Sequence, residues 1–580
     1  MKGEKTRSIA LRRRGLAAWA CAATVLVTIY LLIGRLEPLG SPRAFHGRLA
    51  ATILTGLLVI YPVAAIGAIL GLGFFTRVVV VRSKRSGRLA PAWALRAMLA
   101  CGSMVLAILV AEAAASACLG FRHRMPSFPA RFPEKLPGDP IELVVIGGSS
   151  ALGAPYEDWL SVGAIVGREL ERAIPGGRFH VSVLAEKGAS LERMHHKLAA
   201  LERRPDALIV YSGHNEFLAR FTLENQTVYY DDERPAARAW AMLDRLGRVS
   251  AVFRLTRENL EKERVGLLPS QALGTVERTI GRPSASAAET QAVLADFAAR
   301  LEAITALCER IGCLPILVVP PGNDYADPNH SYADPRTLHH QRQALFDRLV
   351  EARRREADSP ADAIAAYRAI LADQPRFAVA HHRLARLLDD SGQFALANRH
   401  YIMARDCDGL PLRCISAIEE AYHAVARRHA ASAILIDGPA ILRAASKRGV
   451  IDRALVHDLV HPTLAGYGLL AQAVLTELKM HKAWGWPEST PAPTIEPSQL
   501  ESEFRLDSSA WATICKRVAA QYEMIEFLTV DPGERIAWRD RFLEAAKRLS
   551  AGARPPRLGL PGVGAREPFS KTSPESTNGP

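Results

Sequence analysis

The sequence predicts an α/β protein, with a parallel sheet covered by helices on both faces, attached to a helical membrane anchor. Short apolar segments alternate with amphipathic helical segments from residue 141 to about residue 480. Glycine and other turn residues follow several of these apolar segments directly, as at the carboxyl ends of buried parallel strands. The long apolar runs are confined to roughly the first 120 residues.

The anchor is expected to comprise residues 1–124 and three membrane-spanning helices. Its apolar runs are Gly15–Gly34, Ala50–Phe74 and Trp93–Leu119, each able to cross about 30 Å of hydrocarbon as a helix. A signal peptide would have a shorter apolar core than the first run, so we expect that this run stays uncleaved. Two spans plus one buried helix remain an alternative.

Charge distribution predicts the orientation of the anchor. Residues 1–124 contain 17 Lys or Arg and three acids, whereas the other 456 residues sum to −1. Basic residues precede the first run and fill residues 77–88, so both segments should be cytoplasmic and everything after Arg124 extracytoplasmic. We therefore expect a multi-pass protein of the cell (inner) membrane with a periplasmic or otherwise extracytoplasmic domain. A nucleic-acid partner is not expected, because the excess positive charge lies beside apolar helices.

Glu112 of the anchor and the cysteines of the remaining chain each allow more than one interpretation. Glu112 lies within the third run, where a carboxylate can be functional or can face polar neighbours near the outer interface, which we favour. Either Cys308–Cys313 or Cys407–Cys414 could form a disulfide, although buried free thiols are the simpler expectation.

The remaining chain divides into an α/β domain and two helical additions. A Pro-rich linker covers 125–140, and the domain is expected at 141–358 and 409–482. We expect its strands at Glu142–Ile146, Phe179–Leu184, Ala207–Tyr211, Leu314–Val319 and Ala433–Ile436. We expect its helices at Trp159–Ala173, Ser190–Arg203, Ala287–Arg310 and Leu464–Leu478. A polar segment, about Thr222–Pro283, reads as an insertion, residues 483–550 as a helical extension, and 551–580 as a disordered tail.

The segment 359–408 carries an internal repeat. Ala363, Tyr367 and Ile370 recur 34 residues later as Ala397, Tyr401 and Ala404, the period of a tetratricopeptide (TPR) repeat. We expect its helices to bury Ala363, Tyr367, Leu384, Ala397 and Tyr401, and to expose Arg383, Arg386, Arg399 and His400. Because the insertion follows a strand of the parallel sheet, it should begin at the carboxyl edge of the sheet, which is where sites of such sheets lie. We therefore expect it near the mouth of a site at that edge. There it could recognise a large acceptor or a partner protein, or be a packing lobe without a ligand.

Four separated segments supply the groups that a serine nucleophile needs. Residues 144–153 form an apolar strand and a small-residue turn that exposes Ser149, with Ser150 as the rival nucleophile. Asp458 precedes His461 by three residues, so that its carboxylate can orient the imidazole. Glu186-Lys187-Gly188-Ala189 and Ser212-Gly213-His214-Asn215-Glu216 lie between them. Singly, Ser149 could cap a helix, Asn215 could hold a turn, and His461 could pack at a helix start.

In these blocks the sequence resembles the SGNH (GDSL-type) hydrolase family. The matching positions are Gly147-Gly148-Ser149 with Gly153, then Gly188, Gly213-His214-Asn215-Glu216 and Asp458-Leu459-Val460-His461. The resemblance implies a flavodoxin-like sheet, Ser149 as nucleophile, His461 as general base and Asp458 as its orienting acid. It also implies an oxyanion hole formed by the amides of Ser149 and Gly188 and the side chain of Asn215. Gly148 and Glu216 depart from the pattern, which has Asp at both positions.

We expect a serine esterase that acts on an acylated envelope carbohydrate or lipid and uses neither cofactor nor metal. His214 could contact substrate or be a histidine of a surface turn, whereas His195 and His196 have no third ligand in view and are not expected to bind a metal. The alternatives are an O-acyltransferase of an envelope polysaccharide that uses the same triad, and a non-catalytic scaffold that binds a partner through the TPR-like insertion.

Overall fold

The computed structural model describes residues 61, 64–82, 91–122, 132–133, 135–136, 138–218, 246–247, 249–255, 280, 287–334, 337, 339–529 and 532–553. The chain divides into two compact units, one of residues 1–114 with 234–253 and one of residues 115–233 with 254–580. The expected span at residues 15–34, most of the 222–283 insertion and nearly all of the 551–580 tail lie outside the described residues.

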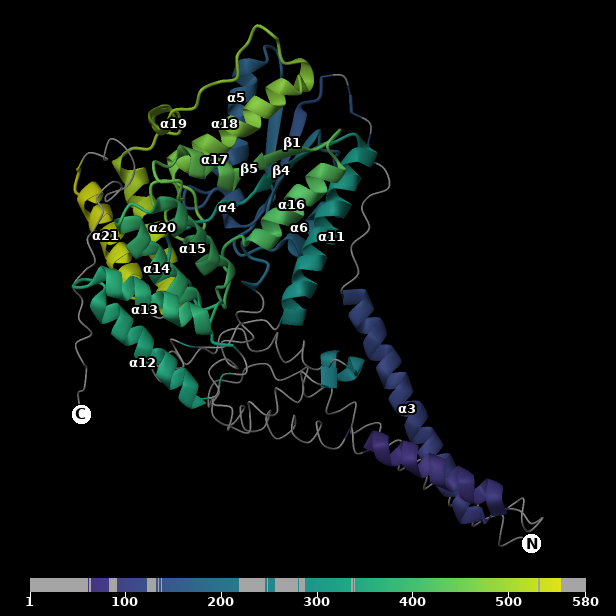
Figure 1. Ribbon diagram of the computed structural model, residues 1–580. Coiled ribbons are helices and arrows are strands. Elements are labelled where there is room, and N and C mark those ends of the chain that lie inside the picture. Colours follow the sequence, from purple (N-terminus) through teal and green to yellow (C-terminus); the bar gives the residue numbers. More distant parts are fainter. Residues whose placement is uncertain are drawn as a thin grey trace. The chain divides into compact units, whose positions relative to one another are not determined.

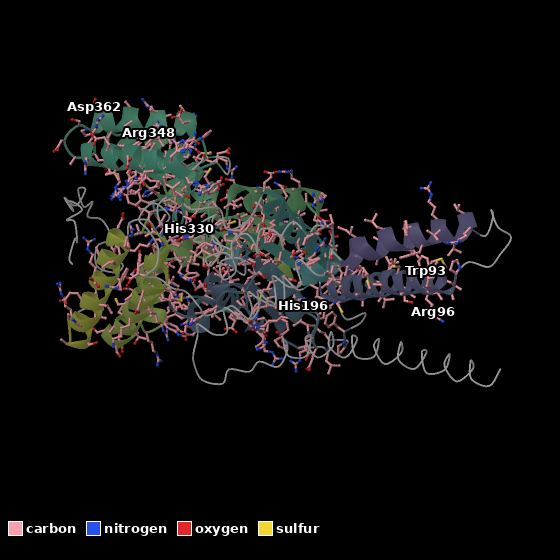
Figure 2. All side chains as sticks on the ribbon, turned by 90° about the horizontal axis from the view of Figure 1, so that it is seen from below. Trp93, Arg96, His196, His330, Arg348 and Asp362 are labelled. Carbon is pink, nitrogen blue, oxygen red and sulfur yellow. The ribbon has the colours of Figure 1, made fainter. Side chains whose placement is uncertain are left out.

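Two helices are long and apolar enough to cross a membrane, Ala64–Arg82 in the first unit and Ala92–Leu119, which begins in the first unit and ends in the second. The second belongs to α3 (Ala92–Arg122), which carries Trp93 and Arg96 near its start (Figure 2). Only 6% of each apolar stretch is buried within the protein. These helices overlap the runs expected at 50–74 and 93–119, but the first runs on through Arg77 to Arg82, into the basic segment that was expected to form a loop.

Glu112 of α3 is bonded to neighbours within the first unit. Its carboxylate accepts hydrogen bonds from the Tyr61 hydroxyl at 2.9 Å, from the Ser250 hydroxyl, and from the backbone N–H of Ala251 at 2.6 Å. A carboxylate with three donors is satisfied where it stands. This agrees with the interpretation that Glu112 faces polar neighbours.

The second unit is built on one parallel sheet with strand order β2-β1-β3-β4-β5, the order of flavodoxin-like doubly wound sheets. Its strands are β1 (Ile141–Gly147), β2 (Phe179–Val183), β3 (Ala207–Tyr211), β4 (Leu314–Val319) and β5 (Ile434–Asp437). β1 pairs with β2 through Val145↔Val183 and with β3 through Gly147↔Tyr211. All five predicted strands are confirmed, with bounds that differ by at most one residue.

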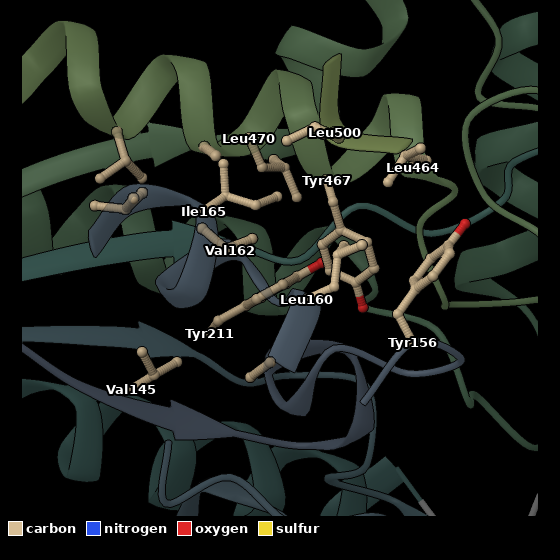
Figure 3. Close-up of a cluster of buried hydrophobic side chains, with 14 of the residues drawn as sticks. Val145, Tyr156, Leu160, Val162, Ile165, Tyr211, Leu464, Tyr467, Leu470 and Leu500 are labelled. Atoms are coloured by element: carbon tan, nitrogen blue, oxygen red, sulfur yellow. The ribbon is translucent and has the colours of Figure 1, made fainter. Parts of the chain in front are cut away.

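Helices cover both faces of the sheet (Figure 1). The face that includes Leu143 and Val145 packs against α5 (Val162–Ala173) and α18 (Leu464–Met480), and Figure 3 shows Tyr211 of the sheet and Tyr467 of α18 meeting in this core. The opposite face packs against α6 (Leu191–Leu198), α11 (Ala287–Ile311) and α16 (Ser416–Arg428). Alternate strand residues thus bury into two separate cores, so near-continuous apolar strands are required.

The remaining helices of the unit belong partly to the domain and partly to the two helical additions. They are α12 (His339–Arg355), α13 (Pro360–Asp373), α14 (Ala378–Asp390), α15 (Phe394–Asp406), α17 (Gly438–Ala445), α19 (Pro497–Glu503), α20 (Ser508–Ile525) and α21 (Gly533–Ser550). The helices α12 to α15 enclose a third core, while Arg348 and Asp362 lie on the outer pair α12 and α13 (Figure 2). α6 ends at Leu198 rather than at the expected Arg203.

The interior of the 359–408 insertion was predicted correctly, but its surface was not. Ala363, Tyr367, Leu384, Ala397 and Tyr401 are all fully buried. The expectation that Arg383 and Arg386 face outward was wrong, because helices outside the insertion cover them. Arg383 donates to Glu356 at 3.2 Å, and Arg386 donates to Glu534 of α21 at 2.6 Å. His400 is half-buried and lies with its Nδ1 2.9 Å from Nδ1 of His381, whereas Arg399 is exposed.

The cysteines of the described residues are all free. Cys308, Cys313, Cys407 and Cys414 are buried, so neither suggested disulfide is present in this structure.

Candidate functional site

The strand–turn–helix that carries Ser149 depends on glycines. β1 ends at Gly147, whose φ of +151° suits glycine and where a Cβ would lie 1.9 Å from the carbonyl oxygen of Tyr211. The short helix α4 (Ser149–Leu152) follows, with Gly148 as its N-cap. Ser149 is therefore the first residue within the helix and not its cap, and its hydroxyl is directed elsewhere.

Ser149, His461 and Asp458 form a hydrogen-bonded chain. The Oγ of Ser149 lies 2.7 Å from Nε2 of His461, and Nδ1 of His461 lies 2.6 Å from Oδ2 of Asp458. A carboxylate can only accept, so Nδ1 of the neutral imidazole carries the hydrogen and Nε2 accepts from the serine. Residues 312 positions apart in the chain are thus placed as nucleophile, base and orienting acid.

Asp458 is held in its ionised form. Burial raises the pKa of its carboxyl group, but the charge of His461 and hydrogen bonds from the His461 side chain and the N–H groups of Val460 and His461 outweigh burial and lower the pKa to about 2. Oδ1 accepts from those two N–H groups at 2.9 and 3.0 Å while Oδ2 holds the ring. One carboxylate therefore fixes both the loop and the imidazole.

Ser150, the rival nucleophile, faces the other way. Its side chain is buried, and its hydroxyl donates to the carbonyl oxygen of Val460 at 2.8 Å. Ser150 thus ties the nucleophile turn to the histidine loop, and Ser149 is the serine that reaches the imidazole. The carbonyl oxygens of Ser150 and Ala154 in turn lie 2.8 and 2.9 Å from the hydroxyl of Tyr467.

Asn215 lies next to the sequence neighbours of the other two expected oxyanion donors, Gly148 beside Ser149 and Ala189 beside Gly188. Its Nδ2 donates to the carbonyl oxygen of Ala189 at 3.1 Å, and a Cβ on Gly148 would lie 2.4 Å from the same nitrogen. Gly188, which precedes Ala189, has φ +71° and lies after the end of β2. The second hydrogen on Nδ2 is not used by the Ala189 bond, so Asn215 can offer it to an oxyanion formed next to Ser149.

The two positions that depart from the family pattern have local explanations. Gly148 is required by the close approach of the Asn215 amide, since any side chain would collide with it. Glu216 accepts from the N–H of Leu191 at 3.1 Å and from the Ser212 hydroxyl at 3.2 Å, and so joins the Asn215 turn to the start of α6. Burial raises the pKa of Glu216 to about 7, despite these hydrogen bonds.

His214 is a buried part of the site and not a surface residue. Its Nδ1 accepts a hydrogen bond from the N–H of Cys414 at 3.0 Å, so the hydrogen of the neutral ring is on Nε2. Burial, together with the nearby charge of His461, lowers the pKa of His214 to about 3. His214 therefore stays neutral and links the oxyanion segment to the chain that follows the insertion.

The two histidines of α6 lie in different surroundings. His195 is buried towards α11, where burial and the charge of Arg300 lower its pKa to about 4, and His196 is exposed (Figure 2). Within the described part of the chain, no three His, Cys, Asp or Glu side chains are grouped so that they could hold a metal ion.

Sequence reasoning missed three residues around the site. Asn323 follows β4 and contacts the histidine loop, Tyr467 braces the Ser150 turn, and the Tyr156 hydroxyl lies 3.0 Å from Nε2 of His457. Asn323 and the Pro-Pro-Gly turn before it mark a strand end, which was a usable signal, whereas a tyrosine on an apolar helix looks like ordinary core. Comparison with protein-family models finds no match to this chain, and comparison with curated proteins finds no relative.

Proposed function

We propose that this protein is a serine esterase of the SGNH type that works through an acyl-enzyme on Ser149. The supporting observation is the chain from Ser149 Oγ through His461 to Asp458, with contacts of 2.7 and 2.6 Å. The proposal also agrees with the position of Asn215, with the location of the site at the carboxyl edge of parallel strands, and with the order of the sequence blocks. Under this proposal, the helices of residues 359–408 are a TPR-like insertion in the esterase domain.

Acylation would use the three side chains in turn. As the Ser149 oxygen attacks the ester carbonyl carbon, its proton moves to Nε2 of His461, and Asp458 stabilises the imidazolium that forms. The carbonyl oxygen becomes an oxyanion, which the Asn215 amide and the Ser149 and Gly188 N–H groups would stabilise. The tetrahedral intermediate then expels the alcohol oxygen, which takes the proton from Nε2.

Deacylation decides between hydrolysis and transfer. Water loses a proton to Nε2 of His461 as it attacks the acyl-enzyme, and the collapse of the second intermediate returns the proton to Ser149 and releases a carboxylic acid. A sugar hydroxyl in place of water would give an O-acyltransferase with the same residues. We propose an acylated carbohydrate or lipid of the cell envelope as substrate, because the two apolar helices would hold the domain beside a membrane.

The test uses full-length protein in detergent micelles with p-nitrophenyl acetate and longer acyl esters as probes, with and without an oligosaccharide acceptor. We expect Ser149→Ala to abolish ester cleavage, His461→Ala nearly to abolish it, and Asn215→Ala to lower turnover by about 10²–10³. Ser150→Ala is the matched control and should retain a reactive Ser149. Wild-type rates for Ser149→Ala would refute the proposal, and acylated oligosaccharide detected by mass spectrometry would indicate transfer.

A further inference from the structure

We infer that Asn323 is a positioning residue for the general base, a role that rests on the proposed function of Ser149 and His461. Asn323 lies just after β4, outside all four sequence blocks, and is fully buried. It holds the loop of residues 456–461, which carries Asp458 and His461, through its side chain and its backbone.

The side-chain amide of Asn323 bonds the loop on both sides of His457. Nδ2 donates to the carbonyl oxygens of Val456 at 3.2 Å and Asp458 at 2.9 Å, and the backbone N–H donates to that of Leu459 at 2.9 Å. A flipped amide would place Oδ1 against two carbonyl oxygens, so these contacts determine the orientation of the side chain. Asn323 thus supplies three donors to three of four successive carbonyls.

The other carbonyl oxygens of the loop also have donors. That of His457 accepts from the Tyr522 hydroxyl at 2.8 Å, that of Val460 from the Ser150 hydroxyl, and that of His461 from the His457 N–H at 2.8 Å. Every carbonyl from 456 to 461 is therefore satisfied, and Asn323 alone accounts for half of them. Among the described residues, Asn323 donates to more of these carbonyls than any other residue does.

Arg413 supports Asn323 from the side of the insertion. Its Nη1 donates to the carbonyl oxygens of Asn323 at 2.8 Å and Ala326 at 2.9 Å, and its side chain is buried. Arg413 follows α15 by a few residues and precedes Cys414, whose N–H bonds His214. The segment that leaves the insertion therefore braces the base loop through Asn323 and the oxyanion segment through His214.

Loss of the Asn323 amide should affect the rate more than substrate affinity. Asp458 and His461 would keep their chemistry but lose a fixed position, and displacement of about 1 Å can cost roughly 100-fold in rate. We expect Asn323→Leu to lower kcat by about 10–100-fold, with KM changed by less than about twofold, because Asn323 does not touch substrate.

Asn329→Leu is the matched control. Asn329 is also fully buried and bonded, with Nδ2 donating to Leu410 and Oδ1 accepting from Arg535, but it does not contact the 456–461 loop. Both substitutions remove a buried amide, so both should lower the thermal midpoint. Only Asn323→Leu should slow the reaction of folded protein with a fluorophosphonate probe, which labels activated serines. Asn323→Ser, a smaller change, should show a weaker effect in the same direction if the leucine variant does not fold.

The outcomes separate the two proposals. In one outcome, the probe labels Ser149 of the wild type, and folded Asn323→Leu or folded Asn323→Ser is labelled with the same rate constant as the wild type. That outcome would overturn the positioning role and leave the esterase proposal intact. Equal rate losses in the Asn323 and Asn329 variants would also overturn it, because the effect would then be only structural. A wild type that neither labels nor hydrolyses any ester would overturn both.

Discussion

A Cβ on Gly148 would lie 2.4 Å from Nδ2 of Asn215, closer than non-bonded atoms can approach. The residue before the nucleophile and the proposed oxyanion donor are thus packed against each other. The Asp that the SGNH pattern has at this position does not fit here without moving Asn215.

We therefore predict that Gly148→Asp, although it introduces the residue of the SGNH pattern, lowers turnover by about 10²–10³, as loss of an oxyanion donor does. The measurement is kcat on p-nitrophenyl acetate in a double-mutant cycle with Asn215→Ala. If displacement of Asn215 is the cause, the double variant should be no slower than Asn215→Ala alone. Additive losses would show that the aspartate acts by another route.

Glu216 should make stability depend on pH. Burial raises its pKa from 4.5 to about 7, so between these pH values the folded protein retains a proton that the unfolded chain has released. Stability should fall as pH rises through this window. Glu216→Gln cannot titrate, and its Oε1 can accept from Leu191 and Ser212, so we predict a smaller decline and a thermal midpoint a few degrees above wild type at pH 8. The partly exposed Glu192→Gln is the control, and a wild-type slope in Glu216→Gln would contradict the prediction.

Glu534 should be a main link between α21, the insertion and the histidine loop. Its carboxylate accepts from Arg386 at 2.6 Å and from Arg453 at 2.8 Å, and these two cations lower its pKa despite burial. Glu534→Gln leaves two largely buried cations with a neutral partner, and we predict a loss of about 3–5 kcal/mol in the free energy of unfolding, read as a lower thermal midpoint. Glu544→Gln, which breaks the exposed pair with Arg548, should cost less than about 1 kcal/mol. Equal effects would mean that the buried pair contributes no more than a surface pair.

The topology can be tested by fusing a reporter that is active only outside the cytoplasm. We predict activity for fusions after Arg124 and after Ala553, and none for a fusion within residues 83–88, because basic loops stay in the cytoplasm. Cytoplasmic location of the fusion after Arg124 would mean that one of the three expected spans does not cross the membrane.

The strands could be predicted from sequence because each is short and bounded by turn residues, and because β1, β3 and β4 are apolar runs buried on both faces. The same pattern placed Ser149 and Asn215 at one edge of the sheet, since carboxyl ends of parallel strands coincide. The same pattern marks Asn323 as a residue at a strand end, but its role could not be predicted, because its partners are backbone carbonyls some 130 residues later and no motif records them.

The insertion shows where local periodicity fails. Its 34-residue repeat placed Ala363 and Tyr401 inside correctly, because both face neighbouring helices of the same segment. It misplaced Arg386, whose partner Glu534 lies 148 residues later in a helix that periodicity within the insertion cannot reveal. Deletion of 359–408 would also remove the partner of that buried carboxylate, so point substitutions on its surface are the better test of recognition.

Ser149 and His461 are 312 residues apart in the sequence, and this separation determines when the site can form during synthesis of the chain. At roughly 5–20 residues per second, the ribosome adds His461 about 15–60 s after Ser149. Until then the serine hydroxyl has no base and cannot attack an ester. Under the proposed topology, the segment that carries Ser149 follows the last span and leaves the cytoplasm first. The nascent chain would therefore have no esterase activity on the cytoplasmic side, and neither a propeptide nor an inhibitor would be needed to prevent it.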